Sequence, residues 1–199
     1  MLLYKKQVFL VKRFSAHFDA FGKNGTNRGG MFLMGEIRQS SAFIKECIED
    51  SLFLLMENKP YRQIDVKQVC EHAGVGRTSY YRYYQNNDDV ILGAYIRMWT
   101  RWCDVHKVKE RKKFTLDNAE TYFSYNLSIK NRLDVTYKNG LDVVLLRSFE
   151  IIMNDETIGH NYESSFYGYG LFGILKEWWR RGFKETPEEV SQILRDFYK

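Results

Sequence analysis

The clearest pattern of hydrophobic and polar positions lies in residues 64–90, IDVKQVCEHAGVGRTSYYRYYQNNDDV. Apolar side chains recur there at the spacing of one helix face, at Val66, Val69, Cys70 and Ala73. This spacing predicts a short helix that ends at residue 72 or 73. Gly74 follows and can take the left-handed conformation, so the chain can reverse there. Asp65 with Gln68 has the spacing of a capping box at the helix start.

A second helix is expected over residues 77–84, with Tyr80 and Tyr84 directed inward beside Val75. Its outer arc would carry Thr78, Ser79, Tyr81 and Arg82, with Arg77 in the first turn. Two helices joined by such a turn are typical of DNA-reading proteins, in which basic and hydroxyl side chains contact base edges and phosphates. The spacing also fits an ordinary helical hairpin that never contacts DNA.

The stretch AGV, followed by GRTSYYRYY and NNDDV, resembles the recognition module of TetR/AcrR-type regulators. The preceding residues 54–66 resemble the link between the first two helices of that family, and the match extends over residues 40–99. The resemblance implies DNA binding by the second helix. The matching positions are Ala73, Gly74, Val75, Ser79, Tyr80, Tyr81 and Tyr84. The candidate DNA contacts are Ser41, Lys67, Arg77, Thr78, Ser79, Tyr81, Arg82 and Tyr83.

Two positions depart from the family pattern. Asn87 stands where the family usually has a lysine, which predicts one weaker phosphate contact. Asp65 stands where the family commonly has threonine or serine, and its carboxylate caps a helix but repels the DNA backbone. We therefore expect modest DNA affinity or a compensating partner.

The positive charge of the chain is concentrated at its start. Residues 1–35 carry six cations and one carboxylate, a net +5 that equals the net charge of all 199 residues, so the remainder is neutral. This leader, with its flexible GKNGTNRGG run, is interpreted either as a basic arm that enters the minor groove or as a mis-assigned start before Met31 or Met34. Outside the leader, residues 59–85 carry a local net charge of +3, which can attract DNA.

The other apolar patterns predict an all-α protein of two domains. Residues 36–86 would form a three-helix, helix-turn-helix DNA-binding domain, and residues 87–199 a helical bundle for ligand binding and dimerisation. Ser40 or Ser41 would cap the first helix, and a connecting helix would start at Asp88 or Asp89. The faces expected to pack are Ile44, Cys47, Ile48, Ser51, Leu52 and Leu55 in the first helix, and Leu92, Tyr95, Ile96, Trp99 and Cys103 in the connecting helix.

Beyond residue 105 the run HKVKERKK marks an expected inter-domain boundary, interpreted as a solvated loop and not as a second DNA contact. Further helices are predicted over residues 116–129, 133–137, 141–153, 163–181 and 187–198. Thr186, Pro187 and Glu189 have the pattern of a capped helix start.

Residues 166–198 resemble the C-terminal end of a TetR subgroup that includes a dihydroxyacetone-kinase regulator. This resemblance implies a homodimer formed by the last two helices, where glycines permit close helix approach. The expected interface residues are Gly170, Leu171, Gly173, Ile174, Trp178 and Leu194.

Candidates for other chemistry are few. Gly168, Gly170 and Gly173 spell GxGxxG, but the strand that a dinucleotide site requires is not predicted before them. The histidines have no metal-ligand spacing, so we expect no metal, no cofactor and no enzyme activity. The three cysteines are interpreted as buried cytosolic thiols, with redox sensing as the alternative. Aromatic residues that would line an effector pocket, or simply form core, are Trp99, Trp102, Tyr122, Tyr125 and Phe149.

The sequence therefore favours a cytoplasmic, homodimeric regulator that binds double-stranded operator DNA, with no membrane segment. A repressor released by a small-molecule effector is the leading interpretation. An activator or co-activator whose second domain binds a protein partner is the alternative, and absence of an internal cavity would favour it. A nucleotide-binding enzyme is the remaining alternative, which a parallel sheet would support.

Overall fold

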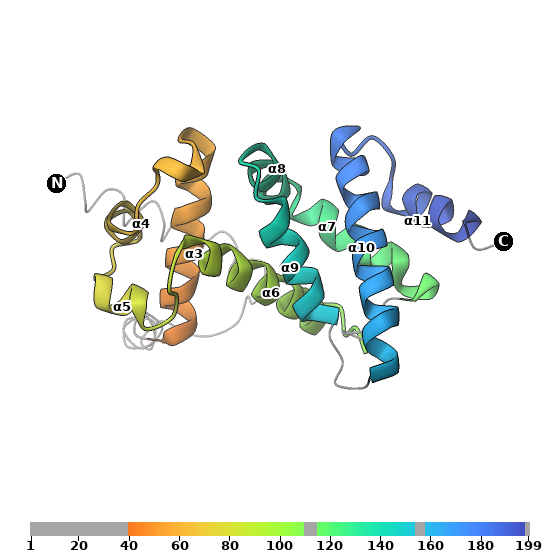
Figure 1. Ribbon diagram of the computed structural model, residues 1–199, viewed down its shortest axis with the longest axis horizontal. Coiled ribbons are helices and arrows are strands. Elements are labelled where there is room, and N and C mark those ends of the chain that lie inside the picture. Colours follow the sequence, from red (N-terminus) through yellow and green to blue (C-terminus); the bar gives the residue numbers. More distant parts are fainter. Residues whose placement is uncertain (1–39, 110–114, 154–157, 198–199) are drawn as a thin grey trace, which may run out of the picture. The chain divides into compact units, whose positions relative to one another are not determined.

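The computed structural model describes residues 40–109, 115–153 and 158–197, and the chain from Ser41 onward forms one compact unit. Every regular element in these ranges is a helix, which confirms the predicted all-α class (Figure 1). The elements are α3 (Ser41–Asn58), η1 (Tyr61–Gln63), α4 (Val66–Ala73), α5 (Arg77–Tyr81), α6 (Asn87–Val105), η2 (Leu116–Asn118), α7 (Ala119–Ser128), α8 (Lys130–Lys138), α9 (Asp142–Met153), α10 (Ile158–Arg180) and α11 (Pro187–Asp196).

Helices α3 and α6 join the two halves of this unit. Helix α3 packs against α4, α6 and α8, while α6 packs against both α3 and α9 (Figure 1). Farther along the chain, α10 packs on α9 and α11 packs on α7. The hydrophobic core is therefore continuous from Ile48 in α3 to Leu194 in α11. Among the described residues, no helix is both long enough and apolar enough to cross a membrane.

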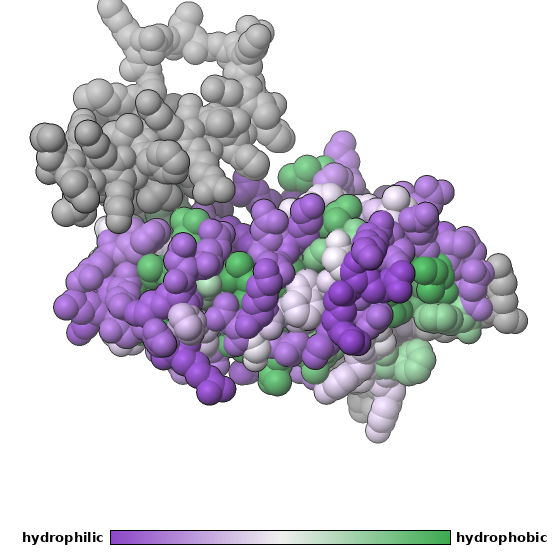
Figure 2. Space-filling model, turned by 90° about the horizontal axis from the view of Figure 1, so that it is seen from above, coloured by the Kyte–Doolittle hydropathy of each residue, from purple (hydrophilic) through white to green (hydrophobic). Residues whose placement is uncertain are grey.

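Helix α3 is buried on more sides than one apolar face predicts. Ile48 and Leu52 are fully buried as expected, but Phe53, Met56 and the carboxylate residue Glu49 are buried as well. The physical reason is that α3 has neighbours on several sides, so positions outside a single stripe also lose contact with solvent. Figure 2 shows the complementary outer surface, where hydrophilic residues cover most of the visible face.

The capping residues behave largely as predicted. Thr186 accepts a hydrogen bond from the Glu189 amide, and the Glu189 side chain accepts one from the Thr186 amide, so the capping box of α11 is confirmed. Helix α6 begins earlier than predicted, because the side chain of Asn86 accepts from the Asp89 amide at 2.9 Å and so acts as the cap. Asp88 and Asp89 occupy the first turn, where their charge stabilises the positive end of the helix dipole.

The packing face predicted for α6 was wrong in part. Tyr95 and Cys103 are buried, but Leu92 and Ile96 are only half-buried, and the other buried residues are Val90, Ile91 and Ala94. Because α6 lies between α3 and α9, its buried arc is rotated from the one that the apolar spacing suggests. The leader, residues 1–35, and residues 110–113 of the charged run lie outside the described residues.

Candidate nucleic-acid interface

The first helix of the predicted pair, α4, starts and ends where the sequence predicts. Asp65 Oδ1 accepts from the Gln68 amide at 2.8 Å, and Gln68 Oε1 accepts from the Asp65 amide at 3.1 Å. Gly74 ends the helix at φ +68°, in the left-handed region that residues with a Cβ rarely adopt. The Val75 amide then donates to the Cys70 carbonyl at 3.0 Å, which fixes the turn between the two helices.

The second helix, α5, is shorter than predicted and ends at Tyr81. The amides of Tyr83 and Tyr84 still donate to the carbonyl of Tyr80, at 3.0 Å each, but the chain then turns toward α6. Tyr80 is fully buried and Tyr84 is 6% exposed, so these two side chains anchor the helix as the sequence predicts.

Asn87 fixes α5 against its neighbours. The Tyr80 hydroxyl donates to Asn87 Oδ1 at 2.8 Å, while Asn87 Nδ2 donates to the carbonyl of Ile64 at 2.8 Å. The side-chain amide of Asn87, in α6, therefore links α6 both to α5 and to the segment that precedes α4. Burial raises the pKa of the Tyr80 hydroxyl, which remains a donor throughout the physiological range. The residue that departs from the family pattern therefore has a structural role here.

A buried charge network, Glu49–Tyr84–Arg97, holds the end of this region. Tyr84 donates its hydroxyl proton to Glu49 Oε1 at 2.5 Å, and Arg97 of α6 binds both Glu49 and Glu46 of α3. Burial and then the Glu49 charge raise the pKa of Tyr84. Burial disfavours the Arg97 cation, but its bonds to Glu49 more than offset this and raise its pKa. Sequence reasoning missed this network, because no local pattern pairs residues in different helices.

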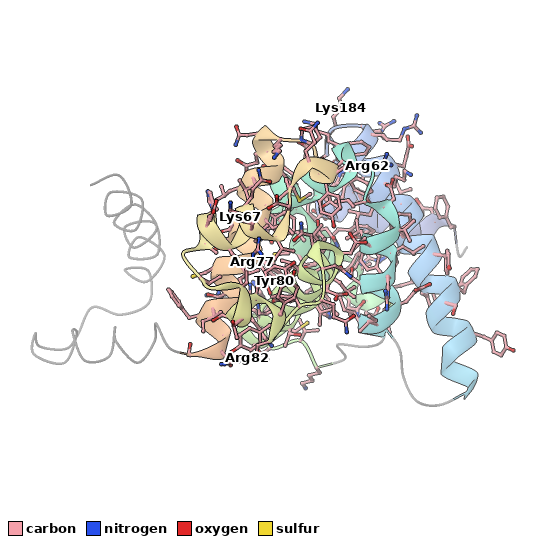
Figure 3. The ribbon with its side chains drawn as sticks, turned by 60° about the vertical axis from the view of Figure 1, so that its left-hand side comes forward. Arg62, Lys67, Arg77, Tyr80, Arg82 and Lys184 are labelled. Carbon is pink, nitrogen blue, oxygen red and sulfur yellow. The ribbon has the colours of Figure 1, made fainter. Side chains whose placement is uncertain are left out.

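The candidate DNA contacts lie on the outer side of the pair. Ser41, Lys67, Arg77, Thr78, Tyr81 and Arg82 are exposed, whereas Ser79 and Tyr83 are half-buried. Figure 3 shows Lys67, Arg77 and Arg82 following one another along α4, α5 and the turn after it. Lys67 is paired only loosely with Glu71, at 3.8 Å, and both side chains are largely exposed. Arg77 and Arg82 form no ion pair with the described residues, so their guanidinium groups are available to an anion.

The aromatic residues predicted to line an effector pocket surround an internal cavity of about 20 Å³. Trp99, Tyr122, Tyr125 and Phe149 line it, together with the buried polar residues Asn126 and Ser148. Trp102 lies outside it and stacks on His106 with ring centroids 3.7 Å apart. A volume of this size holds about one water molecule. The structure therefore brings four of the five predicted residues together, but around a space much smaller than an ordinary ligand pocket.

The residues predicted for a dimer interface divide into two groups. Leu171, Trp178 and Leu194 are at most 5% exposed, because the core of the chain itself uses their side chains. Ile174 is half-buried, while Gly170 and Gly173 lie on the exposed side of α10. That exposed side also carries large aromatic residues that the prediction did not include. These are Tyr162, Phe166 and Tyr169, with exposed fractions of 81%, 67% and 56%.

The GxGxxG glycines lie within α10, and no strand precedes them in the described residues. The structural context that a dinucleotide site requires is therefore missing around these three positions. In the same part of the chain that the structure describes, no group of three or more histidine, cysteine, aspartate or glutamate side chains could hold a metal ion.

Two of the three cysteine thiols have raised pKa values. Cys70 and Cys103 are buried and Cys47 is half-buried, with no disulfide between them. Burial, and then the charges of Asp50 and Glu46, raise the pKa of Cys47 to about 11. Burial also raises the pKa of Cys70. Because the thiolate is the reactive form, this environment disfavours the redox-sensing alternative for these two residues.

Alkylation of Cys47 tests this environment. Since its pKa is raised to about 11, the thiolate fraction should increase about tenfold per pH unit between pH 7 and 10. Iodoacetamide labelling of Cys47 in the folded protein, followed by mass spectrometry, should show that dependence. A rate that levels off near pH 8.5, as for an ordinary thiol, would contradict the assigned burial.

Comparisons with known proteins bear on the second half of the chain. Residues 113–199 match the family model TetR_C_8, described as "Transcriptional regulator C-terminal region". This match confirms the resemblance to TetR-type regulators for the C-terminal region and supports a transcriptional regulator. No curated protein matches the chain. One similar solved structure is described as "Structural analysis of fatty acid degradation regulator FadR from Bacillus halodurans", with 16% identity, a TM-score of 0.46, and coverage of 76% of this chain and 94% of that one.

Proposed function

We propose that this chain, which is similar to TetR-type transcriptional regulators over residues 113–199, is a homodimeric, sequence-specific DNA-binding regulator. The proposal rests on how α5 is held: one side is buried and hydrogen-bonded, and its first turn is exposed. Its buried side is held by Tyr80 and Asn87, while its first turn presents Arg77, which has no ion pair with the described residues, beside Thr78. A rigid, short helix with basic and hydroxyl groups at its N-terminal end fits the major groove.

The candidate contacts have different roles in this proposal. Arg77 and Thr78 would reach base edges, because the N-terminal residues of a recognition helix enter the groove. Ser41, Lys67, Tyr81 and Arg82 would bind backbone phosphates and fix the register. The half-buried side chains of Ser79 and Tyr83 have less reach, so we expect smaller contributions from them.

A mobility-shift titration of the full chain on the DNA upstream of its own gene tests this function. We expect a saturable shift, with weaker binding to unrelated DNA of equal length. The logarithm of the binding constant should fall linearly with the logarithm of the salt concentration. No shift at micromolar protein in low salt, or equal affinity for both DNAs, would contradict sequence-specific binding.

A homodimer is supported by the exposed side of α10. Tyr162, Phe166, Tyr169 and Gly173 recur at intervals of three or four residues, with Gly170 directly after Tyr169. All five are exposed with respect to the described residues. Large exposed aromatic side chains beside glycines favour close packing against another helix. Two copies joined here would have to present their α5 helices about 34–36 Å apart to enter successive major grooves.

Phe166→Glu is expected to convert this dimer into a monomer, because each interface would bury the two new carboxylates without partners. Light scattering coupled to size-exclusion chromatography would measure the mass. Val143→Glu is the matched control, since Val143 is 76% exposed on α9 and lies outside the α10 surface. A dimer that persists in Phe166→Glu, or dissociates equally in both variants, would contradict the interface.

The sign of regulation depends on what the second half binds. A repressor released by a small molecule bound inside its C-terminal half needs a cavity there, and the cavity of about 20 Å³ lined by Trp99, Tyr122 and Phe149 would have to expand greatly. This observation favours the second candidate function, an activator or co-activator whose C-terminal half binds a protein partner. Deleting the gene and measuring the transcript controlled by the upstream DNA distinguishes the two, because loss of a repressor raises transcription and loss of an activator lowers it.

A further inference from the structure

An open groove of about 600 Å³ lies beside the proposed recognition helix. It is bounded by the N-terminal half of α3, the turn after α5 and the outer side of α6. We call it the α3–α6 groove. Its lining includes three cationic residues, Lys45, Arg82 and Arg97, and two acidic ones, Glu49 and Asp89. The aromatic and aliphatic lining residues are principally Tyr81, Tyr83, Leu92 and Ile96.

The charge available in this groove is positive. Glu49 is 1% exposed and is neutralised by Arg97, so neither offers a free charge to a ligand. The Asp89 carboxylate accepts from the Gln85 amide at 3.0 Å and keeps its negative charge, which Lys45 and Arg82 together exceed by one. By contrast, Lys45 and Arg82 form no ion pair with the described residues, and the Lys45 ammonium lies 5.2 Å from the ring centroid of Tyr83.

The aliphatic part of the groove accounts for the two residues of α6 that the sequence wrongly placed in the core. Leu92 and Ile96 are one helical turn apart and half-buried, so they form a continuous apolar surface inside the groove. Half-exposed aliphatic residues beside free cations suit a ligand with an apolar body and an anionic group. A DNA backbone phosphate would use the cations but not the aliphatic surface.

We propose that the α3–α6 groove binds a small amphipathic anion, with its carboxylate or sulfonate group at Lys45 and Arg82 and its apolar body against Leu92 and Ile96. The groove has the volume of an ordinary ligand site, in contrast to the internal cavity of about 20 Å³. The proposal rests on the proposed function in one respect. Arg82 is also a proposed contact to a DNA phosphate, so binding of the anion and binding of DNA would exclude each other. Such a ligand would release DNA by acting directly on the reading half.

Fluorescence titration of the full chain with anilinonaphthalene sulfonate, an aromatic anion that brightens in apolar sites, tests the groove. We expect the wild type to bind the probe saturably. Binding should be at least tenfold weaker in Ile96→Glu, since a carboxylate at this position would repel the probe and remove apolar surface. Lys45→Gln should weaken binding several-fold and leave the fold intact, because this half-buried side chain makes no ion pair with the described residues. Ile193→Glu on α11 and Lys184→Gln are the matched exposed controls and should bind as the wild type does. Binding unchanged in both Ile96→Glu and Lys45→Gln would overturn the site.

Competition between the probe and labelled DNA tests the mutual exclusion. The probe should displace DNA from the wild type, and Ile96→Glu should keep its DNA affinity but lose this sensitivity. Displacement that is equal in both proteins, or absent from the wild type while the groove is occupied, would overturn it. If the chain fails to bind DNA without any probe, the proposed function fails, and the groove is then judged by the fluorescence titration alone.

Discussion

Arg97→Ala is expected to lower the free energy of unfolding by about 3–5 kcal/mol, because it leaves a buried carboxylate without its cation. Glu49 is 1% exposed, and Arg97 is the cation that it binds. The hydroxyl of Tyr84 would remain bonded to Glu49 but cannot neutralise it. Urea unfolding followed by circular dichroism would measure the change as a lower transition midpoint at an unchanged slope.

Arg101→Ala is the matched control for this prediction. Arg101 also pairs with α3, at 3.4 Å from Glu46, but its side chain is 61% exposed, so its loss should change stability by at most about 1 kcal/mol. Glu49→Gln added to Arg97→Ala should recover part of the loss, because the amide still accepts from Tyr84 without a buried charge. Equal small effects of Arg97→Ala and Arg101→Ala would show that Glu49 does not depend on Arg97.

The same network explains why α6 carries a glycine at residue 93. A Cβ built there would lie 3.0 Å from Cε1 of the Tyr84 ring, closer than side chains normally approach. Glycine therefore lets α6 approach the end of the reading pair closely enough for Arg97 and Tyr84 to share Glu49. The position of α5 is thus coupled to both α3 and α6, which are the helices that join the two halves of the described unit.

The features of the reading pair that the sequence predicted are local ones. A capping box needs two residues three apart, and the reversal at Gly74 needs one residue that tolerates positive φ. Helix boundaries that depend on tertiary packing were predicted less well. Helix α5 ends three residues early, because Asn86 starts α6 and the chain has to turn before it.

Residues that act across the fold could not be predicted in the same way. The sequence shows that Glu49 lies on a helix but not that Tyr84 and Arg97 surround it, since these residues are 35 and 48 positions away. Trp178 and Leu194 illustrate a related limit: apolar periodicity marks side chains that must be buried, but does not say whether the core or a partner buries them. In this chain the core does.

The largest functional effect is expected for Arg77→Ala, which should lower DNA affinity without lowering stability. A contact of an arginine with a base edge or phosphate is worth about 1–3 kcal/mol, and a homodimer would lose two of them, so affinity should fall by about 30-fold or more. The Arg77 side chain is exposed and forms no hydrogen bond or ion pair with the described residues, so the unfolding midpoint should stay unchanged. Lys184→Ala, which removes an exposed cation far along the chain, is the control in the same mobility-shift assay.

Arg77→Lys separates the two possible targets of this side chain. Lysine keeps the charge but lacks the planar fork that binds two acceptors on guanine at once. If Arg77 reads a base, Arg77→Lys should lose preference for the upstream DNA while its affinity for unrelated DNA stays close to that of the wild type. If Arg77 binds a phosphate, affinity for both DNAs should be largely retained, because a point charge serves a phosphate nearly as well. Wild-type affinity in Arg77→Ala would instead remove Arg77 from the interface and leave the specificity to Thr78 and Tyr81, the other exposed residues of α5.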